Sequence, residues 1–183
     1  MRAVAARLAP HGFTFIDTLS APPASNALVL LAEYDYGPPS NKKEEVVLKA
    51  YLPQNNPTLQ QELDTCRPWM QQELDLMVSC KHPNIIKPRS AELFVDRLGQ
   101  PYMVLERLRP WTEAKAPLSR ADVHNIARPL FSALKYLHDD LPLEERMIHG
   151  DVKPANVADV LLNTTNTDED EGRGVVAPLK LLD

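Results

Sequence analysis

The chain has 183 residues, of which 44% are hydrophobic and 25% charged, the composition of an ordinary globular protein. The 20 Lys and Arg against 25 Asp and Glu give a net charge of −5, which argues against non-specific binding to nucleic acid. Apolar runs such as residues 27–32 are far shorter than the roughly 18 residues of a membrane-spanning helix, so no membrane partner is expected. The 2 cysteines lack metal-ligand spacing, which favours an intracellular setting, cytoplasmic or nuclear. Residues 1–15 contain two arginines and no acid, which is also compatible with an organelle presequence.

The first part of the sequence predicts strands around one helix. Residues 13–19, 27–36 and 45–51 are rich in apolar and β-branched side chains and are separated by turn segments, so they predict an antiparallel meander. A helix is expected over 59–80, with Pro68 either breaking it or starting its second half. Two further strands are predicted, at residues 91–95 and 102–108, joined by a turn at 96–100.

The second part predicts mainly helix and loop. Apolar residues recur every three to four positions from Val123 to Leu137, so we expect an amphipathic helix that ends near His138 and is kinked by Pro129. A short loop region at 147–157, a polar insertion and a last strand at 179–182 follow. The pattern as a whole predicts an α+β protein.

The segment IHGDVKPANV, residues 148–157, carries the strongest chemical signal. Its Asp151, Lys153 and Asn156 place a carboxylate, an ammonium and an amide on one short loop. A carboxylate can orient a hydroxyl, an ammonium can neutralise charge on a moving phosphate, and an amide oxygen can bind a metal ion, which together suit phosphoryl transfer. The segment closely resembles the catalytic loop HRDxKxxN of eukaryotic-type Ser/Thr protein kinases.

Two further segments resemble the part of that family that holds the ATP phosphates. The run VVLK ends at Lys49, and the resemblance implies that this lysine contacts the phosphates while Val47 lies against adenine. The run ELDLMVSCKHPNII begins at Glu73 and resembles the family's αC helix and the loop after it. The resemblance therefore implies an ion pair between Glu73 and Lys49, with Glu62 as the rival partner.

The run PYMVLERL, residues 101–108, resembles the strand and hinge that receive adenine. The resemblance implies that Leu105 is the gatekeeper and that the backbone of Glu106 and of Leu108 faces the base. The final run LKLLD resembles the strand before the DFG motif, which makes Asp183 a predicted metal ligand.

These matches, in the family's order, imply one truncated kinase domain. Residues 1–108 would form a kinase-like N-lobe, an antiparallel sheet with an αC-type helix and the hinge, and residues 109–183 the first part of the helical C-lobe. The implied activity is transfer of the ATP γ-phosphate to Ser or Thr of a protein substrate, with ATP and Mg²⁺ as cofactors. In that reading Asp151 is the base, Lys153 stabilises the phosphate, and Asn156 and Asp183 bind Mg²⁺.

Three departures from the family pattern bear on activity. The segment SAPPASN at residues 20–26 contains no glycine where the family has a glycine-rich phosphate loop. Gly150 replaces the Arg of HRD, so no switch by activation-loop phosphorylation is expected. The match ends at Asp183, and we expect the 183-residue chain by itself not to phosphorylate protein. A pseudokinase-like interaction module without turnover is the alternative function, and a fragment of a longer kinase is compatible with either.

Overall fold

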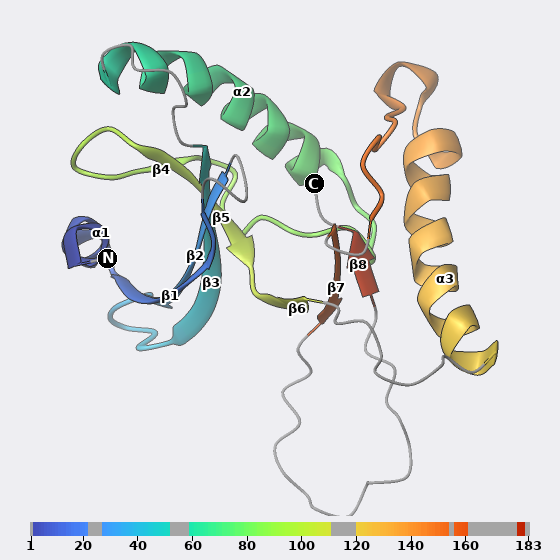
Figure 1. Ribbon diagram of the computed structural model, residues 1–183, viewed down its shortest axis with the longest axis horizontal. Coiled ribbons are helices and arrows are strands. Elements are labelled where there is room, and N and C mark those ends of the chain that lie inside the picture. Colours follow the sequence, from blue (N-terminus) through green and yellow to red (C-terminus); the bar gives the residue numbers. More distant parts are fainter. Residues whose placement is uncertain are drawn as a thin grey trace, which may run out of the picture. The chain divides into compact units, whose positions relative to one another are not determined.

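The computed structural model describes residues 2–21, 27–51, 59–110, 120–153, 156–160 and 179–181 (Figure 1). The chain forms two compact units. The first consists of Met1–Cys80 and Lys87–Arg107, and the second of Lys81–Ile86 and Leu108–Asp183. The predicted division of the chain at residue 108 stays a prediction.

The first unit is built on a five-stranded antiparallel sheet with the order β1-β2-β3-β5-β4. Its strands are Phe13–Ser20, Ala27–Asp35, Lys43–Tyr51, Phe94–Val95 and Pro101–Glu106 for β1 to β5. One face carries the core, in which Leu30, Leu48 and Tyr102 are almost fully buried. The sheet positions the predicted site, because Lys49 on β3 lies opposite Val29 on β2 and Met103 on β5.

Helix α2, Leu59–Ser79, forms where the sequence predicts it and packs against β5. Its inner face buries Met70, Leu74 and Met77, which recur at the three- and four-residue spacing of a helix. Pro68 lies inside the helix at an exposed position and does not end it. The continuous helix places Glu73 one turn beyond Met70, on the side of β3.

The sequence gives no expectation of helix α1, Arg2–Leu8, which lies before the first strand. Leu8 is fully buried in the core of the sheet, and Val4 packs against the same cluster. The turn that follows, Ala9–His11, ends at Gly12, which has a φ of 83°. A side chain there would lie 3.0 Å from the Asp35 carbonyl oxygen, so only glycine lets α1 lead directly into β1.

The fourth strand is shorter than the predicted 91–95, because Ser90 organises a turn instead. Its hydroxyl donates to the Glu92 carbonyl and accepts from the Glu92 amide. Only Phe94–Val95 therefore pairs with β5. The predicted strand at 102–108 is likewise divided, since β5 ends at Glu106 and a new strand begins at Leu108.

The second unit combines helix α3, Arg120–Lys135, with a small antiparallel sheet of order β6-β7-β8. These strands are Leu108–Pro110, Val157–Val160 and Leu179–Leu181, and α3 packs against β8. The sequence predicts a loop region at 147–157 and no strand after it, whereas β7 forms at its end because it pairs with strands on both sides. The helical path continues beyond α3 through a π-helical turn, Tyr136–Asp140, and a 3-10 turn, Leu143–Glu145.

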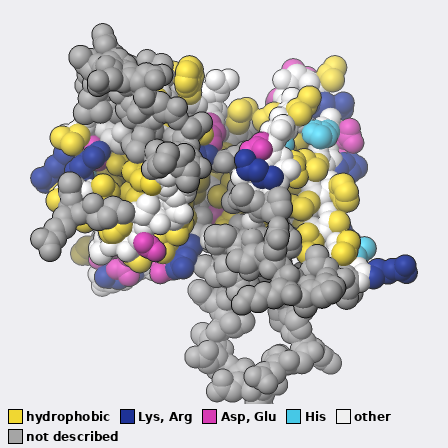
Figure 2. Space-filling model, viewed as in Figure 1, with side chains coloured by type: hydrophobic (Ala, Val, Ile, Leu, Met, Phe, Trp, Pro, Cys, Tyr) yellow, Lys and Arg dark blue, Asp and Glu magenta, His cyan; other side chains and the backbone are white. Residues whose placement is uncertain are grey.

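Large apolar side chains stay exposed on both long helices. Trp69 on α2 is 68% exposed and Phe131 on α3 is 69% exposed. Figure 2 shows hydrophobic side chains running along α3 beside Lys and Arg. Among the residues that the structure describes, no helix combines the length and the apolar character needed to cross a bilayer.

Candidate active site

The loop that follows Met147 brings together Asp151 and Lys153, the predicted catalytic residues, and Asn156, a predicted metal ligand. Lys153 Nζ donates to Asp151 Oδ2 over 2.6 Å, and Asn156 Nδ2 donates to the same oxygen over 3.0 Å. Asn156 Nδ2 also donates to the Asp151 backbone carbonyl over 2.9 Å. The Asn156 backbone N–H donates to the Lys153 carbonyl over 2.9 Å, which closes the turn. Gly150, directly before Asp151, has a positive φ of 76°. A carboxylate, an ammonium and an amide thus share one short turn, as the sequence predicts.

The electrostatics of this loop keep Asp151 ionised. The hydrogen bond from Lys153, together with the charge of its ammonium, holds the pKa of the Asp151 carboxyl below its usual value of 3.8. The hydrogen bond from the Asn156 side-chain amide also lowers the pKa of Asp151. Because the Asp151 side chain is 60% exposed, its carboxylate is also open to a hydroxyl group that approaches from solution. The group is therefore a ready acceptor of a hydrogen bond at neutral pH.

Asn156 fits the role of a metal ligand in its chemistry. The side chain is buried, and its amide nitrogen is engaged by Asp151, so the carbonyl oxygen Oδ1 is the atom suited to a cation. An amide oxygen is a hard ligand of the kind that Mg²⁺ prefers. Its predicted partner, Asp183, lies outside the described residues, and the predicted Mg²⁺ pair stays a prediction.

The second part of the predicted site is the ion pair between Lys49 and Glu73, and the structure contains it. Lys49 Nζ lies 3.0 Å from Glu73 Oε1, and Lys49 is only 6% exposed. A buried ammonium needs a carboxylate partner to offset its lost hydration. Glu73 on α2 is that partner. The rival partner Glu62 lies on α2, but its side chain is outside the described part of the chain.

Sequence reasoning missed Tyr51 at this pair. Its hydroxyl donates to Glu73 Oε2 over 3.0 Å, and the Lys49 ammonium lies 5.4 Å from the centre of its ring. Alternate residues of a strand share a face, so Lys49 and Tyr51 point to the same side of β3. The two-residue spacing from Lys49 to Tyr51 was the sequence signal for this contact. It is a weak signal, because a tyrosine at the end of a strand can make many other contacts.

The predicted adenine hinge is a buried strand that is held from both sides. Leu105 and Glu106 are 4% and 8% exposed, and Val47 lies opposite Leu105 in the sheet. The Glu106 amide donates to the Lys87 carbonyl, and Glu106 Oε1 accepts from the Lys87 amide over 2.7 Å. The Glu106 backbone N–H is therefore engaged by Lys87, and the contact of the Glu106 backbone with adenine stays a prediction. Leu108 is buried and begins β6, where it lies opposite Val160.

Comparisons with known proteins point to one family. The model of the protein kinase domain matches residues 39–183. Cyclin-dependent kinase G1 of Arabidopsis thaliana is 30% identical over 90 residues, which cover 46% of this chain and 14% of that protein. Mitogen-activated protein kinase kinase kinase 5 of Arabidopsis thaliana is 29% identical over 98 residues, which cover 50% of this chain and 13% of that protein. The chain thus matches only a small part of either relative.

Proposed function

Since the chain belongs to the protein kinase family, we propose that it provides the catalytic loop and the ATP-binding lobe of a protein Ser/Thr kinase. The observation that carries the proposal is the loop in which Lys153 and Asn156 both donate to Asp151. A buried Lys49, paired with Glu73, supports it from the other unit. ATP and a protein hydroxyl are the proposed substrates, with Mg²⁺ as cofactor.

Each side chain has a role that its chemistry suits. Asp151 accepts the hydrogen bond of the substrate hydroxyl and directs its oxygen toward the γ-phosphate. Lys153 neutralises negative charge that develops on the transferred group. Lys49 contacts the α- and β-phosphates, and Glu73 holds its ammonium in place. Asn156 and Asp183 would hold Mg²⁺, which offsets charge on the phosphates when it is bound.

The preference for Ser or Thr rests on Lys153. A lysine two residues after the catalytic aspartate is typical of kinases that phosphorylate Ser and Thr. In a phosphoamino-acid analysis of the products, we expect phosphoserine and phosphothreonine. A product that is mainly phosphotyrosine would overturn this part of the proposal.

The test of catalysis is transfer of labelled phosphate from ATP and Mg²⁺ to a generic basic protein. It is measured on a form extended beyond Asp183, because we expect no measurable transfer from the 183-residue chain by itself. Asp151→Asn should lower the rate by roughly 10²- to 10⁴-fold, because the amide cannot accept the hydroxyl proton. Asp139→Asn, at an exposed aspartate of the same unit, is the matched control and should leave the rate unchanged. Equal rates for wild type and Asp151→Asn would remove Asp151 from the mechanism.

The second candidate function is an interaction module without turnover. It is favoured by residues 20–26, which contain no glycine and include Pro22 and Pro23. A glycine-free segment offers fewer close backbone N–H groups to phosphate, and proline offers none. ATP binding with no phosphate transfer under any condition of the assay above would favour this function over catalysis.

A further inference from the structure

The carboxylate of Glu73 is held by two donors from the same strand. Lys49 Nζ donates to one oxygen and Tyr51 Oη donates to the other, each over 3.0 Å. Glu73 itself is partly exposed, with 25% of its side chain open to solvent. With only one donor, such a side chain could move into water, whereas two donors on different oxygens fix its orientation.

Tyr51 contacts the lysine of the pair as well. The Lys49 ammonium lies 5.4 Å from the centre of the Tyr51 ring, within the range of a cation–π interaction. The ring therefore lies beside the cation while the hydroxyl holds its anion. Tyr51 therefore restrains both charged side chains of the pair, Lys49 through its ring and Glu73 through its hydroxyl.

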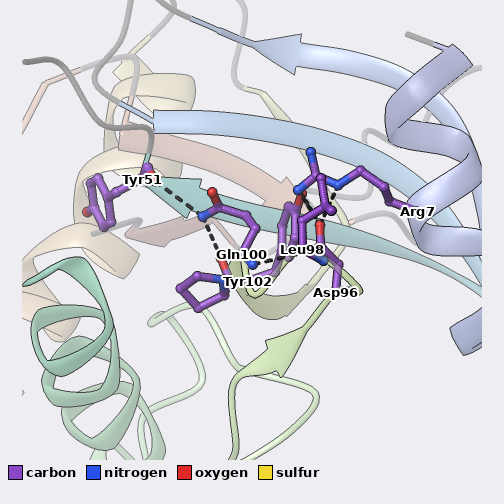
Figure 3. Close-up of polar contacts among 7 residues, drawn as sticks. Arg7, Tyr51, Asp96, Leu98, Gln100 and Tyr102 are labelled. Carbon is purple, nitrogen blue, oxygen red and sulfur yellow. Dashed lines mark hydrogen bonds and ion pairs between the residues drawn. The ribbon is translucent and has the colours of Figure 1, made fainter. Parts of the chain in front are cut away.

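The backbone of Tyr51 is fixed by a buried amide. Gln100 is 5% exposed, and its Nε2 donates to the Tyr51 carbonyl over 3.3 Å and to the Pro101 carbonyl over 3.1 Å (Figure 3). The backbone N–H of Gln100 donates to Asp96 Oδ1 over 3.1 Å. Gln100 thus ties the end of β3 to the turn between β4 and β5.

Helix α1 also contacts the turn between β4 and β5, through Asp96. Asp96 accepts from the Leu98 amide over 2.8 Å, from Arg7 Nε over 2.7 Å and from the Tyr102 hydroxyl over 3.3 Å. In Figure 3 the Arg7 side chain reaches from α1 to this carboxylate, and Gln100 points toward Tyr51. Arg7 and α1 lie before residue 39, where the match to the kinase domain begins.

From these contacts we propose that Tyr51 is a positioning residue that holds Glu73 against Lys49, with Gln100 fixing its place at the end of β3. The proposal rests on the proposed function only in its consequence for ATP. The geometry of the pair is a property of the first unit by itself, so it can be measured without nucleotide. Tyr51 thereby sets how much of the time Lys49 is ready to meet phosphate.

The first measurement follows Lys49 directly, without ATP. The purified chain is acetylated with an amine-reactive ester, and the labelling rate of Lys49 is read by mass spectrometry with Lys135 as internal reference. Tyr51→Phe keeps the ring but removes the hydroxyl that holds Glu73, so Lys49 labelling should rise about three- to tenfold. Glu73→Gln should raise it as well, and adding Tyr51→Phe to that variant should raise it little further.

Tyr36→Phe is the matched control. The Tyr36 hydroxyl also donates to a glutamate, Glu44 Oε2, over 2.9 Å, at the opposite end of the hairpin formed by β2 and β3. This variant loses the same kind of hydrogen bond and should leave Lys49 labelling unchanged. Equal Lys49 labelling in Tyr51→Phe and Tyr36→Phe, with unchanged circular dichroism, would overturn the proposal.

The second measurement is the affinity for ATP with Mg²⁺. Tyr51→Phe should weaken it about three- to tenfold, while Tyr36→Phe should not. If the wild-type chain binds no ATP, the proposed function fails, and the labelling experiment still decides whether Tyr51 positions the pair. If labelling rises but affinity does not change, Tyr51 holds the pair without setting phosphate contact, and that outcome overturns the consequence for ATP.

Discussion

At the scale of single residues, Gly150 shows how a backbone angle decides what a position accepts. Its φ of 76° lies in the left-handed region, which glycine adopts freely and other residues adopt at a cost of about 1 kcal/mol. A Cβ built at Gly150 meets nothing within 4 Å, so space does not restrict the position. The constraint is therefore torsional, and it acts directly before Asp151.

Replacing Gly150 tests this constraint. Gly150→Ala should lower the free energy of unfolding by about 1 kcal/mol, because alanine resists the left-handed backbone. Gly150→Asn should lower it less, since asparagine tolerates this region better than alanine does. Urea unfolding followed by circular dichroism measures both variants. Equal losses for the two would show that the backbone angle is not what selects glycine.

At the scale of elements, length and periodicity decide what the sequence reveals. The 21 residues of α2 and the 16 residues of α3 repeat their apolar positions often enough to predict both helices. The 7 residues of α1 offer too few turns for such a pattern, and its place depends on tertiary contacts of Leu8 and Arg7. Strand β7 is equally hard to predict from the sequence, because it forms by pairing with β6 and β8, which are distant from it in the sequence.

The contact of α1 with the β4–β5 turn should matter for stability. The Asp96 side chain is fully buried and accepts from Arg7, so Arg7→Ala leaves a buried carboxylate short of a charged partner. We expect a loss of about 2 kcal/mol in the free energy of unfolding. Lys43→Ala, which breaks the exposed pair with Glu33, is the control and should cost less. Similar losses in chemical unfolding would mean that Arg7 contributes no more than a surface pair.

The segment that follows α2 should make the stability of the protein depend on pH through His82. Its Nδ1 accepts from the Asn84 amide, its Nε2 lies 3.1 Å from the Ser132 hydroxyl oxygen, and its ring lies beside Tyr136. Burial lowers the pKa of His82 below its usual 6.5, and the charge of Asp140 opposes that shift only in part.

Between the lowered pKa and 6.5, the unfolded chain binds more protons at this position than the folded chain does. Stability is therefore fully present above pH 6.5 and is lost as the pH falls toward the folded pKa. Thermal unfolding at a series of pH values should show this loss in the wild type and a flatter profile in His82→Gln. Identical profiles would exclude His82 as the source.

At the scale of the whole molecule, the sequence reveals the parts of the site that are local and misses the parts that depend on strand pairing. Asp151, Lys153 and Asn156 lie within six consecutive positions, so one motif contains them all. The pair of Lys49 with Glu73 was predicted because it follows from resemblance to a family. The links through Tyr51 and Gln100 depend on which residues meet across β3, β5 and α2, and no local pattern encodes that register.

The nucleotide affinity of the chain should depend on both Lys49 and residues 20–26. The buried Lys49 is suited to the phosphates of ATP, whereas residues 20–26 contain no glycine and two prolines without an N–H group. Losing two or three amide contacts of about 1 kcal/mol each predicts binding roughly 10²-fold weaker than in a site with a glycine-rich loop. Calorimetry should find weak binding that Mg²⁺ strengthens.

Two variants separate the causes of this weakness. Lys49→Ala should weaken binding further, because it removes the buried cation that we propose contacts the phosphates. Lys43→Ala, at an exposed lysine of the same strand, should not. Replacing Pro22 and Pro23 together by glycine restores two backbone donors and should tighten binding, by up to about tenfold per donor regained. If the wild type binds ATP tightly without Mg²⁺, this account is contradicted, because groups other than Lys49 and Mg²⁺ would then hold the phosphates.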